Sequence, residues 1–81
     1  MFKNKTPDGK LNISGKKIAQ LRTAMTKKVS QRALADMLQL EGLDLNKNAI
    51  QQIESGKRFV TDIELAVIAK VLGVSSDELL K

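Results

Sequence analysis

Apolar residues recur along the chain at intervals of three and four, which is the spacing of one face of an α-helix. The first group is Ile18, Leu21 and Met25, and it follows Ser14, a residue type that caps helix N-termini. This pattern predicts a first helix that begins at Ser14 and fades between residues 26 and 29.

A second helix is predicted to begin after Ser30, which is again a suitable N-cap residue. Small Ala35 would let another helix approach closely, and Gly42 suits the left-handed conformation that often ends a helix. The apolar positions of this helix are Ala33, Leu34, Met37, Leu38 and, at its edge, Leu40.

The third predicted helix spans about residues 46 to 55. Asn46 is a favourable N-cap and Gly56 a terminator. Leu45 and Ile50, which flank the first turn, have the spacing of a hydrophobic staple.

Two capping boxes predict the last two helices, because Ser or Thr is followed three residues later by Glu at residues 61–64 and 75–78. The first opens a helix that Gly73 closes, and the second opens a short final helix. The apolar positions of these two helices are Leu65, Ile68, Ala69, Leu72, Leu79 and Leu80.

No segment alternates apolar and polar residues like a β-strand, so the predicted fold class is all-α, with five short helices. A chain of 81 residues fits one domain with a modest core. Residues 1–13 are polar and basic, and we expect a flexible basic N-terminal arm there and a folded domain over 14–81. Lys3, Lys5 and Lys10 of this arm either reach a polyanion or are simply solvated.

The outward face of the third helix carries amides, where an ordinary solvated helix has Lys and Glu. With about 100° between successive residues, Asn48 and Gln52 lie about 160° and 200° from the inward Ile50. Amides carry both a donor and an acceptor and can bond base edges in the DNA major groove. A polar face without function is the alternative, and we favour base readout by Lys47, Asn48, Gln51 and Gln52.

Composition argues against catalysis. The chain has no Cys and no His, and therefore lacks a thiolate metal site, a disulfide framework and the commonest general base. We expect no enzyme, no catalytic residue, no metal and no cofactor. No apolar run approaches the ~20 residues of a membrane span, and the N-terminus lacks a hydrophobic signal core, so we expect a cytoplasmic protein.

The net charge of +5 is unevenly distributed. Residues 1–60 hold 12 Lys and Arg against 5 Asp and Glu, which is +7, and residues 61–81 hold 2 against 4, which is −2. A basic front and an acidic back indicate a polyanionic partner, although a basic surface also aids solubility.

Two stretches are more specific, I-E-S-G-K-R at 53–58 and L-G-V-S-S-D-E-L-L at 72–80. With Ser30–Gln31 and Leu34–Ala35, they resemble the Cro/C1 (XRE) family of phage-repressor-like helix-turn-helix regulators. The resemblance covers about residues 13 to 80. It implies a five-helix, lambda-repressor-like DNA-binding domain, in which helices two and three form the helix-turn-helix and helix three enters the major groove.

The resemblance also implies residue roles. Lys47, Asn48 and Gln52 would contact bases, with Gln51 beside them. Arg22 and Glu54 would form a structural ion pair. The residues that would contact the DNA backbone are Gln31, Ser55, Lys57 and Arg58.

Two junctions are longer than the family pattern. Extra residues lie around 39–43, and we expect most of them to extend the second helix by about one turn, with a loop as the alternative. The junction at 26–29 carries Lys27 and Lys28, which either add backbone contacts or are solvated.

The leading hypothesis is a sequence-specific regulator that binds double-stranded DNA. A homodimer on a two-fold site suits this class, and we expect no membrane association and no small-molecule effector site. The alternative is a protein-interaction module, such as a co-activator or antitoxin part. That function would need aromatic or Met anchors on the third helix, and amides are poor anchors.

Overall fold

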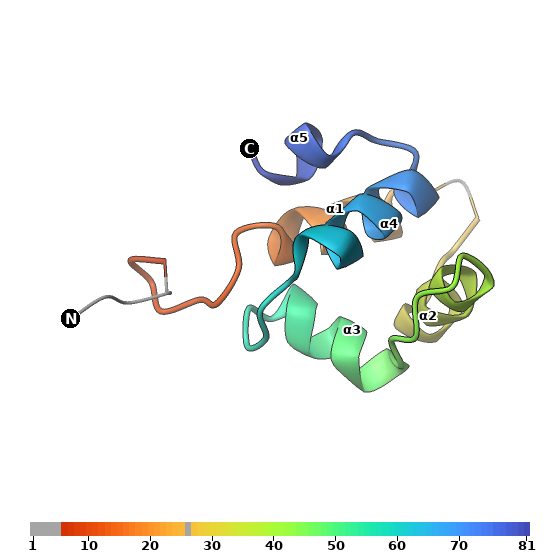
Figure 1. Ribbon diagram of the computed structural model, residues 1–81, viewed down its shortest axis with the longest axis horizontal. Coiled ribbons are helices and arrows are strands. Elements are labelled where there is room, and N and C mark those ends of the chain that lie inside the picture. Colours follow the sequence, from red (N-terminus) through yellow and green to blue (C-terminus); the bar gives the residue numbers. More distant parts are fainter. Residues whose placement is uncertain (1–5, 26) are drawn as a thin grey trace.

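The computed structural model describes residues 6–25 and 27–81, and this part of the chain forms five helices and no strand (Figure 1). The predicted all-α fold is therefore confirmed for the described residues. Lys3, Lys5 and residue 26, which carried sequence predictions, lie outside them. The helices are α1 (Gly15–Thr23), α2 (Gln31–Leu40), α3 (Lys47–Glu54), α4 (Asp62–Leu72) and α5 (Ser76–Leu79).

One apolar core joins all five helices. α2 packs on α3, α4 packs on α5, and α1 contacts both α3 and α4. In Figure 1, α5 lies on the far side of α1 and α4 from α3. Burying each large aliphatic side chain contributes roughly 1.5–3 kcal/mol, so the core fixes how each helix is rotated. Its buried members are Ile18, Leu34, Ala35, Leu38, Leu45, Ile50, Ile53, Ile68, Ala69 and Leu79.

Side-chain caps define where α2, α3 and α4 begin, as predicted. The Ser30 hydroxyl accepts from the backbone N–H of Ala33 at 3.0 Å. The Asn46 side chain accepts from the N–H of Ala49 at 2.8 Å. A complete capping box opens α4, because Thr61 and Glu64 each accept the other's backbone N–H.

The start of α1 differs from the prediction, because Ser14 occupies the N-cap position without a side-chain cap bond and is 2% exposed. The side-chain oxygen of Asn12 instead accepts from the N–H of Gly15 at 2.7 Å. The helix also ends earlier than predicted, at Thr23, whose hydroxyl bonds to carbonyls of the preceding turn.

The extra residues around 39–43 belong partly to α2 and partly to the connection that follows it. Leu40 is the last helical residue, and Gly42 follows with a left-handed φ of +87°. The N–H of Leu43 bonds to the carbonyl of Leu38, an arrangement that closes a helix and turns the chain. The second helix is thus extended by less than the expected turn, and Leu40 is 86% exposed instead of joining the apolar face.

The last helix keeps half of its predicted capping box. Ser75 accepts from the backbone N–H of Glu78, but the Glu78 carboxylate pairs with Lys17 and Lys81. Leu79 is fully buried, and Leu80 lies just beyond the helix and is 47% exposed.

Candidate nucleic-acid interface

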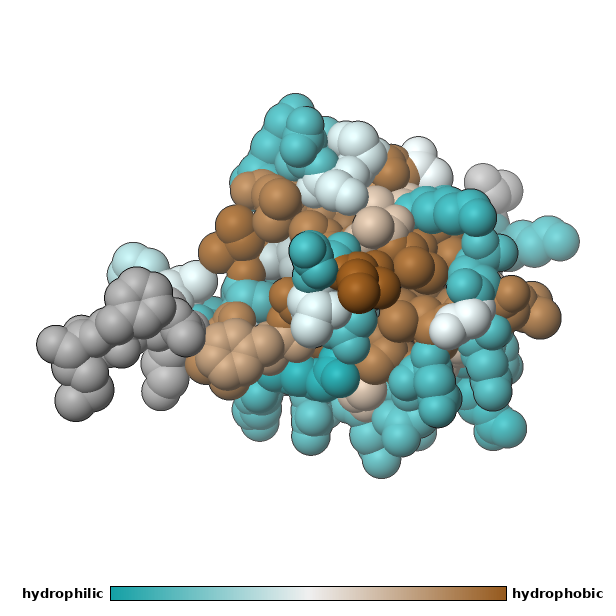
Figure 2. All heavy atoms as spheres, in the orientation of Figure 1, coloured by the Kyte–Doolittle hydropathy of each residue, from teal (hydrophilic) through white to brown (hydrophobic). Residues whose placement is uncertain are grey.

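The amide-rich face of α3 points away from the core. Ile50 and Ile53 are each 1% exposed, which fixes the rotation of the helix. The four residues predicted to read bases, Lys47, Asn48, Gln51 and Gln52, are all exposed. Figure 2 shows hydrophilic side chains along the lower edge, where α2 and α3 lie in Figure 1.

A shallow polar groove separates the exposed side of α2 from the beginning of α3. Lys47 and Asn48 line it from α3, and Arg32 and Gln39 line it from α2. The sequence-based prediction omitted these two α2 residues. Both are polar, exposed positions on the outer side of the second helix, and this was the signal that could have suggested them.

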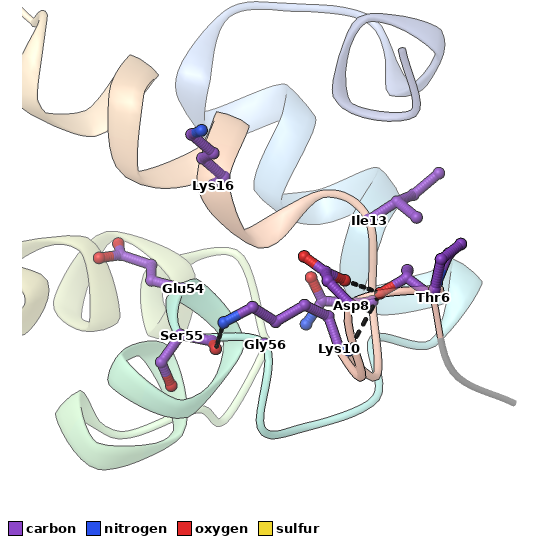
Figure 3. Close-up of a pocket in the computed structure, with 10 residues that line it drawn as sticks. Thr6, Asp8, Lys10, Ile13, Lys16, Glu54, Ser55 and Gly56 are labelled. Atoms are coloured by element: carbon purple, nitrogen blue, oxygen red, sulfur yellow. Dashed lines mark hydrogen bonds between the residues drawn. The ribbon is translucent and has the colours of Figure 1, made fainter.

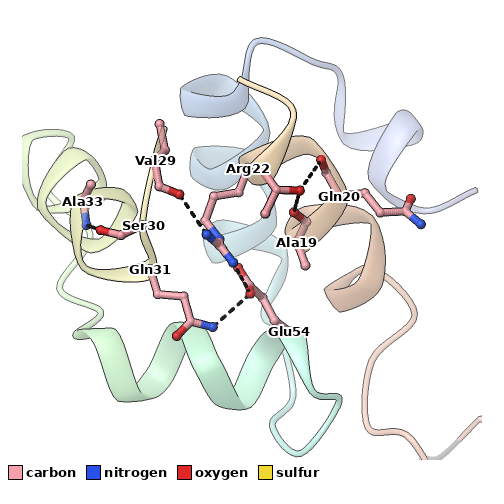
Figure 4. A network of polar contacts seen from close by, with 9 residues as sticks. Ala19, Gln20, Arg22, Val29, Ser30, Gln31, Ala33 and Glu54 are labelled. Atoms are coloured by element: carbon pink, nitrogen blue, oxygen red, sulfur yellow. Dashed lines mark hydrogen bonds and ion pairs between the residues drawn. The ribbon is translucent and has the colours of Figure 1, made fainter. Parts of the chain in front are cut away.

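Arg22 of α1 and Glu54 of α3 form a bidentate ion pair (Figure 4). Nε of Arg22 donates to Oε2 of Glu54 at 2.7 Å, and Nη2 donates to Oε1 at 3.0 Å. The two side chains are only 13% and 7% exposed. Hydrogen bonding to Glu54 holds the pKa of Arg22 above its usual value, although burial opposes this. The pair therefore ties the C-terminal end of α3 to α1.

Two further contacts extend this network toward α2. Nη1 of Arg22 donates to the carbonyl oxygen of Val29 at 2.8 Å. Nε2 of Gln31 donates to Oε1 of Glu54 at 3.0 Å, and Figure 4 shows both contacts. Gln31, which was predicted to bind a phosphate, thus donates one of its amide N–H groups to Glu54. A primary amide has two N–H groups, so one remains for another acceptor.

The segment after α3 presents its polar side chains unequally. Lys57 is exposed, and Ser55 donates its hydroxyl to the carbonyl of Gln52 at 3.2 Å. Nη2 of Arg58 lies 3.3 Å from Oε2 of Glu64, and Nη1 of Arg58 is buried without a hydrogen-bond partner. Lys57 is therefore the freer of the two cations predicted to contact the DNA backbone.

The N-terminal segment is attached to α3 in part. Lys10, Leu11 and Asn12, which were expected in the flexible arm, all hydrogen bond to backbone carbonyls at or just beyond the end of α3. Sequence reasoning missed these contacts. The signal was an Asn three residues before Gly15, the spacing at which a side chain can cap a helix N-terminus.

Charge at this surface is mixed, because Asp36 and Asp44 line the same groove as Arg32 and Lys47. Within the described ranges, Lys47 and Lys57 take part in none of the ion pairs, which instead involve Lys17, Arg22, Arg58, Lys70 and Lys81. In the same part of the chain, no group of three His, Cys, Asp or Glu is placed to hold a metal ion. None of the described helices has the length and apolar character needed to cross a membrane.

A family model described as Helix-turn-helix matches residues 18–79. The match covers more than half of the chain, and all five helices lie within it or begin just before it. The chain therefore belongs to this helix-turn-helix family, of the Cro/C1 (XRE) type, whose members are DNA-binding regulators. Comparisons with curated proteins and with solved structures gave no match.

Proposed function

We propose that this protein is a sequence-specific transcriptional regulator that places α3 in the major groove of double-stranded DNA. The observation that carries the proposal is the exposure of three amides and a lysine on α3, together with the burial of its two isoleucines. In the major groove, Asn or Gln can bond N6 and N7 of adenine together, and Lys can bond guanine. A regulator of this kind acts on cytoplasmic DNA, usually as a dimer on two-fold sites.

Phosphate contacts would come from residues that flank the exposed, amide-rich face of α3. Lys57 lies three residues beyond the end of α3, and Gln31 opens α2, where free backbone N–H groups favour an anion. Arg58 and Ser55 would add to these contacts, and Arg58 would first have to leave Glu64. Phosphate contacts supply affinity without sequence information, whereas base contacts supply specificity.

The protein-interaction alternative is less well supported. The exposed side chains of α3 are Lys, Asn and Gln, without an aromatic or Met anchor. A module that binds protein through α3 would bury these amides, and each would then need a matching partner.

The experiment is selection of binding sites from random DNA, followed by measurements with single variants. We expect Asn48→Ala and Gln52→Ala to relax sequence preference, with a loss of about 1–3 kcal/mol of discrimination at one base pair. Lys57→Ala should weaken binding to all sequences alike and lower the salt slope by about 1. Lys81→Ala, which removes a charge beside α5, is the matched control and should leave the slope unchanged.

Two results would overturn the proposal. The first is wild-type protein that shows no salt-dependent binding to any DNA. The second is a uniform loss of affinity in Asn48→Ala and Gln52→Ala, without any change of preferred sequence. A palindromic selected site would support binding as a two-fold dimer.

A further inference from the structure

The Asn12 side chain links three separate backbone positions. Its Nδ2 donates to the carbonyl oxygen of Ile53 at 3.1 Å and to that of Arg58 at 2.7 Å. Its Oδ1 accepts from the N–H of Gly15 at 2.7 Å. One amide therefore joins the beginning of α1, the last turn of α3 and the segment that follows α3.

The two preceding residues bind the same stretch. The N–H of Leu11 donates to the carbonyl of Gly56 at 2.8 Å, and Nζ of Lys10 donates to the carbonyl of Ser55 at 3.1 Å. Figure 3 shows the Lys10 side chain reaching across to Ser55 beside Gly56. The last carbonyls of a helix have no partner within the helix, and here residues 10–12 provide partners for this end of α3.

Close packing reinforces these hydrogen bonds. A Cβ atom at Gly15 would overlap the carbonyl oxygen of Ile53, the same oxygen that Asn12 binds. The beginning of α1 therefore lies directly against the end of α3. Because backbone meets backbone here, neither side can shift much without losing the Asn12 contacts.

Lys57 lies within residues 55–58, the segment whose backbone carbonyls residues 10–12 bind. Its neighbours Gly56 and Arg58 are both bound through their carbonyls, by Leu11 and Asn12. Its own N–H donates to the carbonyl of Gln52 at 2.8 Å, but its side chain is exposed. The backbone at Lys57 is thus fixed on both sides, and only the side chain is left to move.

We propose that Asn12 is a positioning residue for DNA binding, which holds the segment 55–58 where Lys57 reaches a phosphate. This inference rests on the proposed function and deepens it, because it adds a residue that does not touch DNA. In this arrangement residues 10–12 form part of the binding domain, and Asn12 affects affinity only through the contacts that it positions.

Asn12→Ala provides a clean test because it removes no charge. The slope of log K against log salt counts the phosphates that cations neutralise, so the uncharged Asn12 side chain cannot contribute to it directly. We expect Asn12→Ala to lower the slope by about 1, as the loss of one lysine contact would. Ser75→Ala, which removes the cap of α5 far from α3, controls for a general loss of stability and should keep the wild-type slope.

The double variant Asn12→Ala/Lys57→Ala tests whether the two residues act through one contact. We expect its slope to equal that of Lys57→Ala alone, because residues that share one contact are not additive. A folded Asn12→Ala protein with the wild-type slope would overturn the positioning role, and so would slope changes that add in the double variant. If Asn12→Ala fails to fold, Asn12→Ser retains an acceptor for Gly15 but is too short to reach Ile53 and Arg58 together, and it is judged by the same criteria.

The two proposals fail in different ways. If the wild-type protein binds DNA with a salt slope that Asn12→Ala leaves unchanged, only the positioning role is wrong. If the wild-type protein shows no salt-dependent binding, the DNA-binding function is wrong, and the role of Asn12 falls with it.

Discussion

At the scale of single residues, the Arg22–Glu54 pair is the most deeply buried ion pair of the described structure. Both side chains are largely buried, and the guanidinium meets the carboxylate through two parallel hydrogen bonds. A buried pair costs desolvation, and this cost is offset only while both charges are present. Glu54 would keep just the amide of Gln31 if Arg22 were lost.

Arg22→Met should therefore destabilise the fold by about 3–5 kcal/mol, because it leaves the Glu54 charge buried and unpaired. Arg32→Met, at an exposed arginine of α2, is the control and should change stability by less than about 0.5 kcal/mol. Urea denaturation gives both stability changes from the shift of the unfolding midpoint, provided that the dependence of the unfolding free energy on urea concentration is unchanged. The double variant Arg22→Met/Glu54→Leu should recover most of the loss, and a failure to recover would mean that packing, not charge, is the cause.

The role of an individual residue was predictable from the sequence where it depends only on neighbours within one helical turn. Asn46 and Thr61 cap their helices as their sequence patterns predict, because an N-cap depends on residues only three positions away. Ser14 is also a residue type that suits an N-cap, but its backbone is helical (φ −93°, ψ −17°) and its side chain makes no cap bond, while Asn12 binds the N–H of Gly15. That outcome depends on contacts 41 and 46 positions apart in the chain, which no local pattern reveals.

At the scale of elements, α3 is the helix whose local stability bears most on the proposed function. It has only eight residues, and isolated helices shorter than about 12–15 residues are marginal in water. The burial of Ile50 and Ile53, the Asn46 cap and the contacts of residues 10–12 together compensate for its length.

Asn46→Ala should cost about 1 kcal/mol, because the N–H of Ala49 loses its acceptor. Asn46→Asp retains an acceptor and adds a favourable charge at the helix N-terminus, so it should restore stability. Thermal unfolding followed by circular dichroism measures the difference between the two variants. Equal melting temperatures for Asn46→Ala and the wild type would show that the cap does not stabilise α3.

The connection between α2 and α3 shows how far an element can be predicted. The helical period of Leu34, Met37 and Leu38 continues to Glu41, and it favoured a longer helix. The chain instead turns at Gly42, because Leu43 and Leu45 are drawn toward the core. Periodicity alone does not show which of several nearby leucines is buried in the core. In the structure Leu45 is buried and Leu40 is exposed.

At the scale of the whole molecule, the acidic part of the sequence folds into the helices α4 and α5 and not into the α3 side. The acidic stretch 61–81 forms α4 and α5, and α5 lies on the far side of α1 and α4 from α3 (Figure 1). Such a distribution would turn the α3 side toward a polyanion during an encounter. The charge asymmetry was visible in the sequence, but its direction in space required the packing of the helices.

The first and last helices are connected through Glu78. Its carboxylate pairs with Lys81 and, at 3.5 Å, with Lys17 of α1. Hydrogen bonding to Lys81, followed by the contributions of Lys17, lowers the pKa of Glu78 below its usual 4.5. A group whose pKa is lower in the folded state stabilises the fold above its unfolded pKa, and this contribution is lost as the pH falls through the folded pKa.

The stability of the wild type should therefore fall on acidification below about pH 4.5, partly because Glu78 becomes protonated. Glu78→Gln lacks this ionisation, so it should be less stable than the wild type at neutral pH and should approach it at low pH. Asp77→Asn removes a neighbouring charge that makes no ion pair in the described structure, and it should keep the wild-type acid dependence. Melting temperatures between about pH 3 and pH 7 give this comparison, because this range lies on both sides of the usual Glu pKa. A constant difference between Glu78→Gln and the wild type across that range would mean that the link between α1 and α5 does not depend on the charge of Glu78.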